Sequence, residues 1–461
     1  MKTTGSRSLI LYILGLGFFF GLGVFLYGMY TEGNTWAMQP FNKHLSGGSL
    51  VANSGKIVDR NNVVLAKSEN GKRVYNSDET TRRAMLHCVG DGKGYISTSI
   101  QYNYRSELSG YNFITGLTSP TGKTMGNDIK LTLDSRLCKY ALQKLGNSKG
   151  AVAVYNYKTG EMLCMVSSPN FDPSNPPKDL DTDKTGKYNG VYLDHVLSSS
   201  YTPGSIFKIV TTAAAIENIP DLDSRTFNCN KTMTVNGNKI TCMGRHGNIN
   251  FKNGLAKSCN IVFANLAMEL GKDKMTKTAN SLGFNKSFDL DGIKTAKSVY
   301  DVKDAEENEL AWSGIGQYTN LTNPYHMMLM MGSIANHGTA VKPYLVDTIS
   351  TSYGVTTKKA QTKTEDPFLS ASTADKLKGY MRYNVSNYYG DGRFPGLSVC
   401  AKTGTGEVGE NKKPNGWMVG FSANEKTPFA FTVVVENVDS SIGSAGQIAS
   451  AVMKETARLI K

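Results

Sequence analysis

The side chains most able to do chemistry in this chain lie in three short motifs that are widely separated in the sequence. Ser205 and Lys208 come first, Ser258 and Asn260 follow, and Lys402 opens a Lys-Thr-Gly-Thr segment. A serine hydroxyl is a poor nucleophile until a base removes its proton, and a lysine becomes such a base when its pKa is lowered. Together these residue types could support acyl transfer through a serine ester.

The first motif is predicted to lie at the start of a buried helix. A loop ending in Pro203 and Gly204 precedes it, and the residues from Ser205 to Ile216 are mostly apolar and lack Gly and Pro. Residues i and i+3 share one helix face, with Cβ atoms about 5–6 Å apart, so Lys208 is expected beside the Ser205 hydroxyl. A surface lysine after a capping serine is the alternative, but Lys208 stands inside an apolar run.

The second motif places Ser258 and Asn260 two residues apart. Both side chains could point into a cleft, where the hydroxyl would relay a proton to a leaving amine and the amide would hold a substrate peptide. Taken alone, the tripeptide is better explained as a polar turn at the start of a helix. Cys259 between them is interpreted as a small buried side chain rather than as a second nucleophile.

The third motif, Lys-Thr-Gly, occurs twice in the chain. Lys158 lies between two strand-like runs, which predicts a hairpin turn and a solvated side chain. Lys402 follows a strand-like run, so this copy is the one expected in the site, where it would bind a substrate carboxylate. Gly404 would let that strand approach the serine segment closely. The backbone N–H groups of Ser205 and Thr405 would form an oxyanion hole.

An apolar stretch near the N-terminus predicts a membrane anchor. The chain has 461 residues, 40% of them hydrophobic, which predicts two or three domains with a large core. Residues 9–30 contain no charged side chain and are long enough to span a bilayer, and Lys2 and Arg7 before them predict a cytoplasmic N-terminus. A cleaved signal peptide is the alternative, but its apolar region would be shorter and residues 35–37 form a poor cleavage site. Everything after residue 30 is then expected outside the cytoplasm.

Two features leave their interpretation open. Gly17 and Gly21 form a G-x-x-x-G pattern in the apolar stretch, with Gly28 one heptad after Gly21. This pattern fits either the close approach of another membrane helix or the ordinary abundance of Gly in such helices. The net charge of +13 fits weak adhesion to anionic lipids or wall polymers, or lysines that merely keep the protein soluble. Nucleic acid is not an expected partner of an exported domain.

The cysteines and histidines show no recognisable metal-binding pattern. Seven cysteines are present, so at least one is unpaired within the chain. Cys229 and Cys242 flank a predicted hairpin around Asn236 and Gly237, and could form a disulfide across it. The sequence contains no C-x-x-C or H-E-x-x-H, and its six histidines show no ligand spacing, so we predict neither a metal nor another cofactor.

The order of predicted elements favours an α+β fold. After a polar connector, residues 55–66 are expected to form two strands joined by a turn at Asn61 and Asn62. A helix capped by Asp134 and ended by Gly146 follows. The remaining expectations are strands near 150–156 and 161–167, a helix-rich stretch at 205–345, a polar segment at 350–365, strands near 397–404, 416–422 and 428–436, and a terminal helix near 444–460. One antiparallel sheet covered by helices accounts for this order.

The three motifs in this order, S-x-x-K, S-x-N and K-T-G, resemble the signature of penicillin-binding proteins and serine β-lactamases. Nearly the whole chain is similar to class B penicillin-binding proteins of the PbpA-like type. The further segments that carry this resemblance are 201–208, 314–317, 321–324 and 416–420. Residues 55–66 resemble the membrane-proximal box of that class, although Ser54 and Asn62 replace its usual Arg and Gly.

The resemblance implies a chain in four parts at the cell membrane. These are a cytoplasmic tail at 1–8, a transmembrane anchor at 9–30, a connector with a β-rich pedestal module at 31–132, and a penicillin-binding transpeptidase domain at 133–461. The last would contain a central antiparallel sheet flanked by helices. A single-pass protein with its catalytic domain outside the cytoplasm is therefore expected.

The resemblance also implies a mechanism and its substrate. Ser205 would attack the penultimate D-Ala of a peptidoglycan stem peptide while Lys208 takes its proton. Ser258 with Lys402 would help to protonate the departing D-Ala, and an amine from a second stem would resolve the ester into a cross-link. The residues implied to bind the substrate are Lys402, Thr403, Gly404 and Thr405. β-Lactams would acylate the same serine as covalent inhibitors.

Two other kinds of protein share these motifs. One is a β-lactam-binding sensor or β-lactamase, and the other is a scaffold whose main role is to bind a cell-wall glycosyltransferase. A class D β-lactamase is much shorter and soluble, and a sensor carries several membrane helices and a cytoplasmic protease domain. Since the chain shows no glycosyltransferase domain of its own, the resemblance implies a SEDS-type partner of the FtsW/RodA family.

Overall fold

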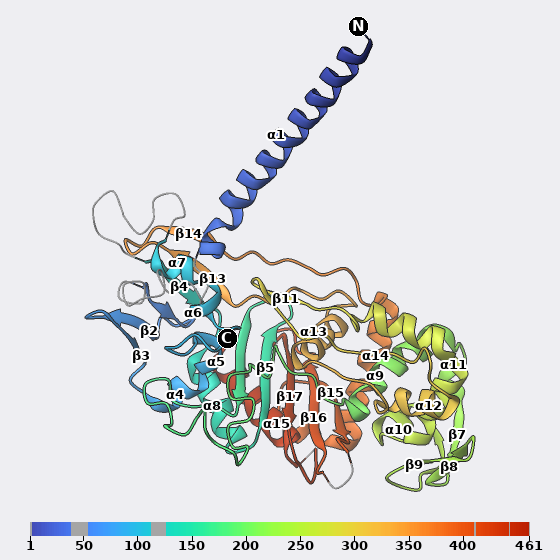
Figure 1. Cartoon of the computed structure of the whole chain (residues 1–461). Coiled ribbons are helices and arrows are strands. Elements are labelled where there is room, and N and C mark those ends of the chain that lie inside the picture. The colour runs from blue at the N-terminus through green and yellow to red at the C-terminus, as the bar shows by residue number, and fades with distance from the viewer. Residues whose placement is uncertain (1, 38–53, 112–125, 410–411, 442, 461) are drawn as a thin grey trace.

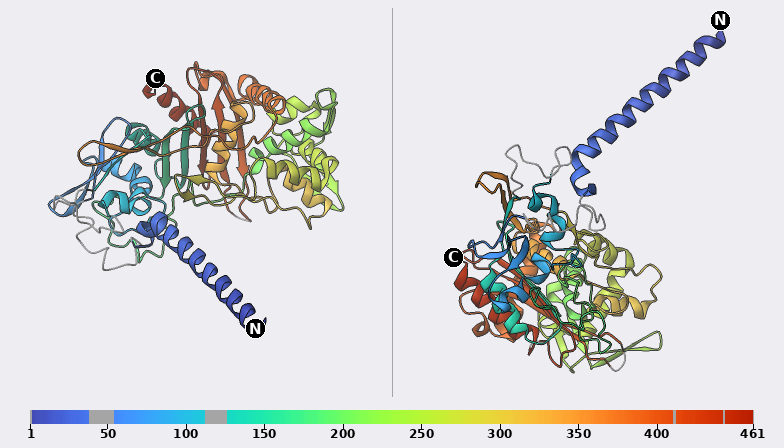
Figure 2. Two further views of the ribbon diagram at one scale, coloured as in Figure 1. Left: turned by 90° about the horizontal axis from the view of Figure 1, so that it is seen from above. Right: turned by 60° about the vertical axis from the view of Figure 1, so that its left-hand side comes forward.

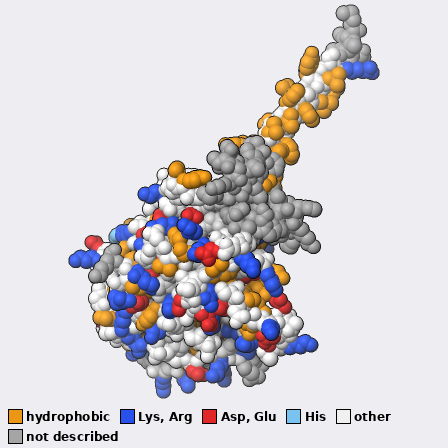
Figure 3. Space-filling view, turned by 90° about the vertical axis from the view of Figure 1, so that its left-hand side faces the viewer, with side chains coloured by type: hydrophobic (Ala, Val, Ile, Leu, Met, Phe, Trp, Pro, Cys, Tyr) orange, Lys and Arg blue, Asp and Glu red, His pale blue; other side chains and the backbone are white. Residues whose placement is uncertain are grey.

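The computed structural model describes residues 2–37, 54–111, 126–409, 412–441 and 443–460. Its first helix, α1 (Lys2–Ala37), projects away from the folded body that holds the other labelled elements (Figure 1). The stretch Arg7–Gly33 within it has a mean hydropathy of 2.5 and is long enough to cross a membrane. Hydrophobic side chains cover this exposed helix, whereas on the body below Lys and Arg are interspersed with Asp and Glu (Figure 3).

A six-stranded sheet with the order β14-β13-β4-β1-β2-β3 forms the module next to α1 (Figure 1). Its strands are β1 (Ile57–Val58), β2 (Val64–Glu69), β3 (Lys72–Tyr75), β4 (Asp128–Leu131), β13 (Val346–Ser350) and β14 (Thr356–Lys359). The predicted turn joins β1 to β2, and Asn62 adopts a φ of 63° there. β13 and β14 come from far beyond residue 133, so the sheet draws strands from both sides of the predicted boundary.

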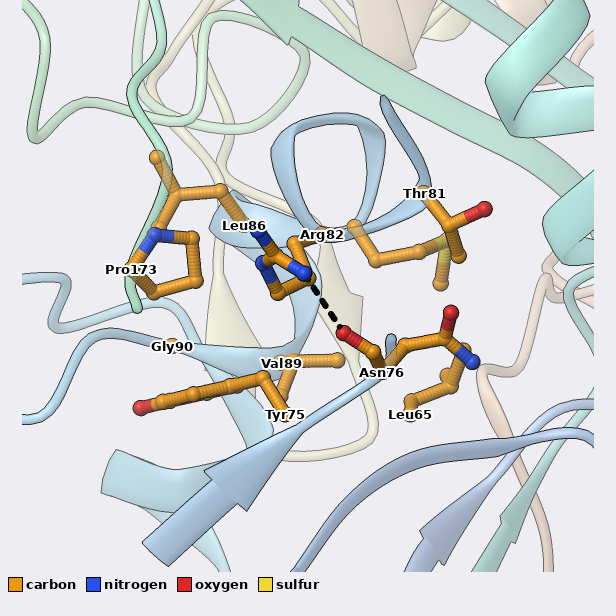
Figure 4. A pocket seen from close by; sticks show the side chains of 10 residues that line it. Leu65, Tyr75, Asn76, Thr81, Arg82, Leu86, Val89, Gly90 and Pro173 are labelled. Carbon is orange, nitrogen blue, oxygen red and sulfur yellow. Dashed lines mark hydrogen bonds between the residues drawn. The ribbon is translucent and has the colours of Figure 1, made fainter. Parts of the chain in front are cut away.

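Short helices complete this module and join it to the rest of the body. They are α4 (Glu79–Ala84), α5 (Leu86–Val89), α6 (Ile100–Asn103) and α7 (Arg105–Ser109). Arg82 on α4 donates to both carboxylate oxygens of Asp172, at 2.7 and 2.6 Å, and to the backbone oxygen of Asn76. Figure 4 shows Arg82 and Pro173 lining a small pocket at this junction. The two-pronged ion pair therefore fixes the loop after β6 against the module.

A five-stranded antiparallel sheet with the order β15-β16-β17-β5-β6 forms the centre of the larger unit (Figure 1). Its strands are β5 (Gly150–Asn156), β6 (Met162–Ser168), β15 (Val399–Gly406), β16 (Asn415–Ser422) and β17 (Phe429–Val435). β6, β16 and β17 are buried along their whole length, because helices cover both faces of the sheet. The α+β fold class predicted from the sequence is therefore confirmed.

Helices α8 (Ser135–Leu145) and α15 (Ala445–Leu459) pack together on one face of this sheet, and α13 (Pro324–Ala335) packs on the other (Figure 2). The predicted cap of α8 is present, since the Asp134 carboxylate accepts from the backbone N–H groups of Arg136 and Leu137. Gly146 ends the same helix with a φ of 61°, as the sequence predicted.

A helical region lies beyond the β15 edge of the sheet (Figure 1). Its helices are α9 (Lys208–Asn218), α10 (Phe251–Ala256), α11 (Asn260–Ser281), α12 (Glu307–Ile315) and α14 (Ala371–Asn384). The helix predicted to start at Ser205 is divided in two, because Gly204 has a φ of 53° and opens a 3₁₀ turn, η1 (Gly204–Ile206), before α9 begins. Other short elements are η2 (Leu222–Ser224), η3 (Val385–Tyr389), η4 (Asp391–Arg393), β11 (Asp289–Leu290) and β12 (Ile293–Lys294).

Two small ladders interrupt the helical region. They consist of β7 (Thr226–Cys229) with β10 (Gly247–Asn250), and β8 (Thr232–Val235) with β9 (Asn238–Thr241). The hairpin predicted at Asn236 and Gly237 is the β8–β9 turn. Cys229 pairs instead with Gly247 in the other ladder, and both Cys229 and Cys242 are free thiols among the residues described here. The possible Cys229–Cys242 disulfide is therefore not formed in this structure.

Candidate active site

Lys208 opens α9 and its side chain is completely buried. Its Nζ donates to the backbone oxygen of Ser258 and to Oδ1 of Asn260, both at 2.7 Å, and lies 3.2 Å from Ser258 Oγ. Burial lowers the pKa of Lys208 well below its usual range, and the neighbouring Lys402 cation lowers it further. A neutral amine that donates two hydrogens to carbonyl oxygens keeps its lone pair for a hydroxyl proton.

A second buried lysine approaches Ser258 from the sheet. Lys402 lies in β15, and its Nζ donates to Ser258 Oγ at 3.0 Å and to the backbone oxygen of Thr403 at 2.8 Å. Burial lowers the pKa of Lys402 to about 7. An incoming carboxylate would favour its charged form. Ser258 Oγ thus bridges Lys208 and Lys402, and the three groups form one continuous route for a proton.

The second motif forms the junction between α10 and α11. Ser258 adopts a φ of 55° there, and Asn260 is the first residue of α11. The Asn260 amide holds Lys208 through its oxygen, and its nitrogen donates to the backbone oxygen of Thr241 at 2.8 Å. From the sequence, this amide was predicted to hold a substrate peptide. In the structure the oxygen and the nitrogen of the amide both contact the protein, so the amide holds Lys208 in place.

Ser205 lies in the 3₁₀ turn η1, which packs directly against β15. A Cβ atom on Gly404 would lie only 2.7 Å from the backbone oxygen of Pro203, so glycine is required for this contact, as expected from the sequence. No hydrogen bond joins Ser205 Oγ to Lys208 Nζ within the described part of the chain. Catalytic hydrogen bonds often tighten only when substrate is bound, so this geometry is compatible with a nucleophile and its base.

The segment around Gly316 supports the serine turn from behind. Gly316 ends α12 with a φ of 92°, and its backbone oxygen accepts from the N–H of Gly204 at 2.9 Å. A Cβ atom on Gly316 would lie 2.0 Å from the backbone oxygen of Gly204. Close backbone packing therefore explains why two glycines flank Ile315 in this segment.

A cleft of about 860 Å³ opens along β15. It is lined by Met243, Ala256, Lys257, Ser258, Tyr389, Thr403, Thr405, Glu407, Gly409, Lys412, Pro414, Asp439, Ser440 and Ser441. β15 is an edge strand of the described sheet, so its outer backbone groups, including those near Thr405, are open to a peptide. The cleft thus brings together an edge strand and the hydroxyl that contacts both lysines.

Two residues that the sequence analysis missed hold the third motif in place. The Tyr389 hydroxyl, at the end of η3, accepts from the backbone N–H of Thr403 at 3.4 Å. Ser441 Oγ donates to the backbone oxygen of Gly404 at 2.6 Å and lies 2.8 Å from Thr405 Oγ1. No short motif surrounds Tyr389 or Ser441, so only the tertiary structure reveals them.

The second copy of Lys-Thr-Gly lies outside this cleft. Lys158 is exposed in the turn between β5 and β6, and its Nζ donates to Oδ1 of Asn336 at 2.8 Å. The turn and the solvated side chain agree with the prediction from the sequence.

Comparisons with known proteins place this geometry in context. Residues 150–454 match the penicillin binding protein transpeptidase domain family. Peptidoglycan D,D-transpeptidase PbpA of Mycolicibacterium smegmatis is 28% identical over 386 residues, which cover 77% of this chain and 77% of that protein.

Two solved structures share the fold over most of the chain. The D,D-transpeptidase domain of a peptidoglycan glycosyltransferase from Eggerthella lenta has a TM-score of 0.75 and 27% identity, covering 88% of this chain and 98% of that one. Penicillin-binding protein A from M. tuberculosis, solved as a ceftriaxone acyl-enzyme complex, has a TM-score of 0.77 and 22% identity, covering 89% and 99%.

Proposed function

We propose, since the chain belongs to the penicillin-binding protein transpeptidase family, that it is a peptidoglycan D,D-transpeptidase acting through an ester on Ser205. One structural observation supports the assignment of the catalytic residues. Two buried lysines, Lys208 and Lys402, meet at Ser258 Oγ beside the turn that holds Ser205. Burying two amines costs free energy and lowers their pKa values. Lowered pKa values of this kind suit proton transfer to and from a serine.

The first half of the reaction forms the acyl-enzyme. Ser205 Oγ attacks the carbonyl carbon of the penultimate D-Ala and gives its proton to Lys208 Nζ. The backbone N–H groups of Ser205 and Thr405 stabilise the oxyanion. A proton then passes through Ser258 to the nitrogen of the terminal D-Ala, the C–N bond breaks, and D-Ala leaves.

The second half transfers the acyl group to an amine. An amine of a second stem peptide attacks the ester carbonyl, and its proton returns through Ser258 and Lys208 to Ser205 Oγ as the C–O bond breaks. The cross-link is then complete and the serine hydroxyl is restored. Lys402, with the hydroxyls of Thr403 and Thr405, binds the terminal carboxylate of the donor, which favours the charged form of the lysine.

A peptide exchange assay tests this function with the full-length chain in detergent. With a stem pentapeptide ending in D-Ala-D-Ala and a separate acceptor peptide, mass spectrometry should show one D-Ala released per new amide bond. A donor ending in L-Ala-L-Ala is the matched control and should give no product. Sustained hydrolysis of penicillin without cross-linking would identify a β-lactamase, and absence of both activities would favour a scaffold.

The same proposal places the enzyme on the outer face of the cell membrane. α1 is compatible with a single-pass anchor, and Arg7 before its apolar stretch favours a cytoplasmic N-terminus. Glycan polymerisation would come from a SEDS-type glycosyltransferase of the FtsW/RodA family. Gly17 and Gly21 on α1 have no described atom of another segment within 4 Å of a built Cβ, so this stripe is open to a partner helix.

Replacing both Gly17 and Gly21 with Leu should weaken co-purification with such a polymerase about tenfold, because close backbone approach is lost. The variant should remain in the membrane and still react with penicillin. Gly15 and Gly23 lie on a different face of α1, so their double replacement with Leu is the matched control. Equal loss in both double variants, or no loss in either, would make Gly17 and Gly21 ordinary lipid-facing residues and direct the search to residues 45–130.

A further inference from the structure

Three thiols and one imidazole gather around the middle residue of the second motif. Cys229 ends β7, Cys242 follows β9, His246 precedes β10, and Cys259 is the N-cap of α11. Their ligand atoms all lie within 4.8 Å of one another. The three cysteines are buried and the histidine is partly buried, so the cluster is enclosed by protein rather than spread over the surface.

The spacing of these atoms fits a bound metal ion better than a disulfide. Cys242 Sγ lies 3.9 Å from Cys259 Sγ and 3.7 Å from His246 Nδ1. A tetrahedral zinc ion, with Zn–S near 2.3 Å and Zn–N near 2.0 Å, separates its ligand atoms by about 3.8 Å (S···S) and about 3.5 Å (S···N). A disulfide would require a separation of about 2.05 Å. The two measured distances are therefore close to the edges of a zinc tetrahedron.

We propose that one Zn²⁺ ion binds here, in a closed site whose ligands are Cys229, Cys242, His246 and Cys259. Thiolate and imidazole donors in this number are typical of structural zinc sites. Four protein ligands fill the tetrahedron and leave no position for water or substrate, so the ion holds the fold and takes no part in the acyl transfer.

Hydrogen bonds around the cluster already hold its four segments together. The backbone N–H of Asn260 donates to Cys242 Sγ at 3.3 Å, an arrangement that stabilises a metal-bound thiolate. The backbone N–H of His246 donates to the backbone oxygen of Cys229 at 3.1 Å. These contacts join the ligand-bearing segments in two pairs, Cys229 with His246 and Cys242 with the start of α11.

This inference replaces the prediction from sequence that the chain binds no metal. The ligands follow the pattern Cys-x₁₂-Cys-x₃-His-x₁₂-Cys, in which only Cys242 and His246 are close in sequence, whereas common zinc motifs have two close pairs. Two β-ladders and a helix start bring them together. The ion would anchor Cys259, and through it the Ser258 hydroxyl and the Asn260 amide on either side. Its existence does not depend on the role proposed for Ser205.

Metal analysis of the full-length chain, purified in detergent without added metal, tests the site. Native mass spectrometry and elemental analysis should find about one Zn²⁺ per chain. Cys229→Ser and His246→Ala should each lower this below about a tenth of an equivalent. Cys88→Ala removes a buried thiol outside the cluster and should retain the ion. His246→Cys supplies a fourth thiolate and should also retain it, which distinguishes a ligand from a residue needed only for packing.

Cobalt substitution adds a spectroscopic readout. Co²⁺ in the wild-type site should show the intense visible absorption of tetrahedral thiolate coordination, and Cys229→Ser should lose it. A wild-type chain that binds no Zn²⁺ even when it is added, or a Cys242–Cys259 disulfide in peptide maps, would overturn the site. Zinc retained by both Cys229→Ser and His246→Ala would overturn it too. Thermal unfolding of each variant reports folding separately, and failure of penicillin labelling in the wild type would count against the proposed function alone.

Discussion

Replacing Ser205 by Ala is expected to abolish covalent labelling by benzylpenicillin. Intact-mass spectrometry should show one adduct on the wild-type chain and none on the variant, with transpeptidation reduced by about 10⁴-fold or more. The reason is chemical: in the proposed mechanism Oγ of Ser205 forms the ester, whereas Lys208 and Lys402 move protons and carry no acyl group.

Ser200→Ala is the matched control, because Ser200 lies in the same loop and its hydroxyl donates to the backbone oxygen of Lys297. Its adduct should equal that of the wild type. An adduct that persists in Ser205→Ala would move the nucleophile elsewhere, and peptide mapping would then examine Ser258, whose Oγ contacts both buried lysines.

Replacing Lys402 by Ala is expected to slow acylation by penicillin by about 10²-fold or more, measured as a second-order rate constant. The variant loses the donor that contacts Ser258 Oγ at 3.0 Å and, in the proposed mechanism, the cation that binds the substrate carboxylate. Because Lys402 is completely buried, Ala also leaves a cavity. Lys402→Met keeps most of the volume and should be slowed as strongly, with thermal unfolding measured on both variants.

Lys158→Ala provides the comparison, since Lys158 heads the other Lys-Thr-Gly segment and is exposed. It loses a surface contact to Asn336 and should acylate at the wild-type rate. Slow acylation in Lys158→Ala together with a normal rate in Lys402→Ala would reverse the assignment of the third motif.

Local sequence patterns predicted the elements whose signals are themselves local. The cap at Asp134 and the stop at Gly146 bound α8 because both act within one helical turn. Strands β6 and β17 are nearly continuous apolar runs, since both faces of the central sheet are covered. β13 and β14 were missed because their pairing is long-range: all four residues of β14, Thr356–Lys359, are exposed and show no alternation.

The candidate site likewise contains residues that local patterns identified and contacts that only the tertiary structure reveals. The three motifs identified Ser258 and Lys402, but the bridge between the two lysines depends on how β15, α9 and α11 pack. The division of the serine helix follows from the positive φ of Gly204, which a propensity argument does not reveal. Tyr389 and the cysteine cluster depend on tertiary contacts between distant segments, so no window of sequence contains them.

The position of β4 in the six-stranded sheet has a consequence for how the chain folds while it is being synthesised. β4 lies between β1 and β13, yet β13 is synthesised long after it. Until Val346–Ser350 has been synthesised, one edge of β4 stays unpaired, and such an edge can pair wrongly while the chain is still emerging. The module beside α1 therefore begins to form early in synthesis and is among the last parts of the fold to be completed.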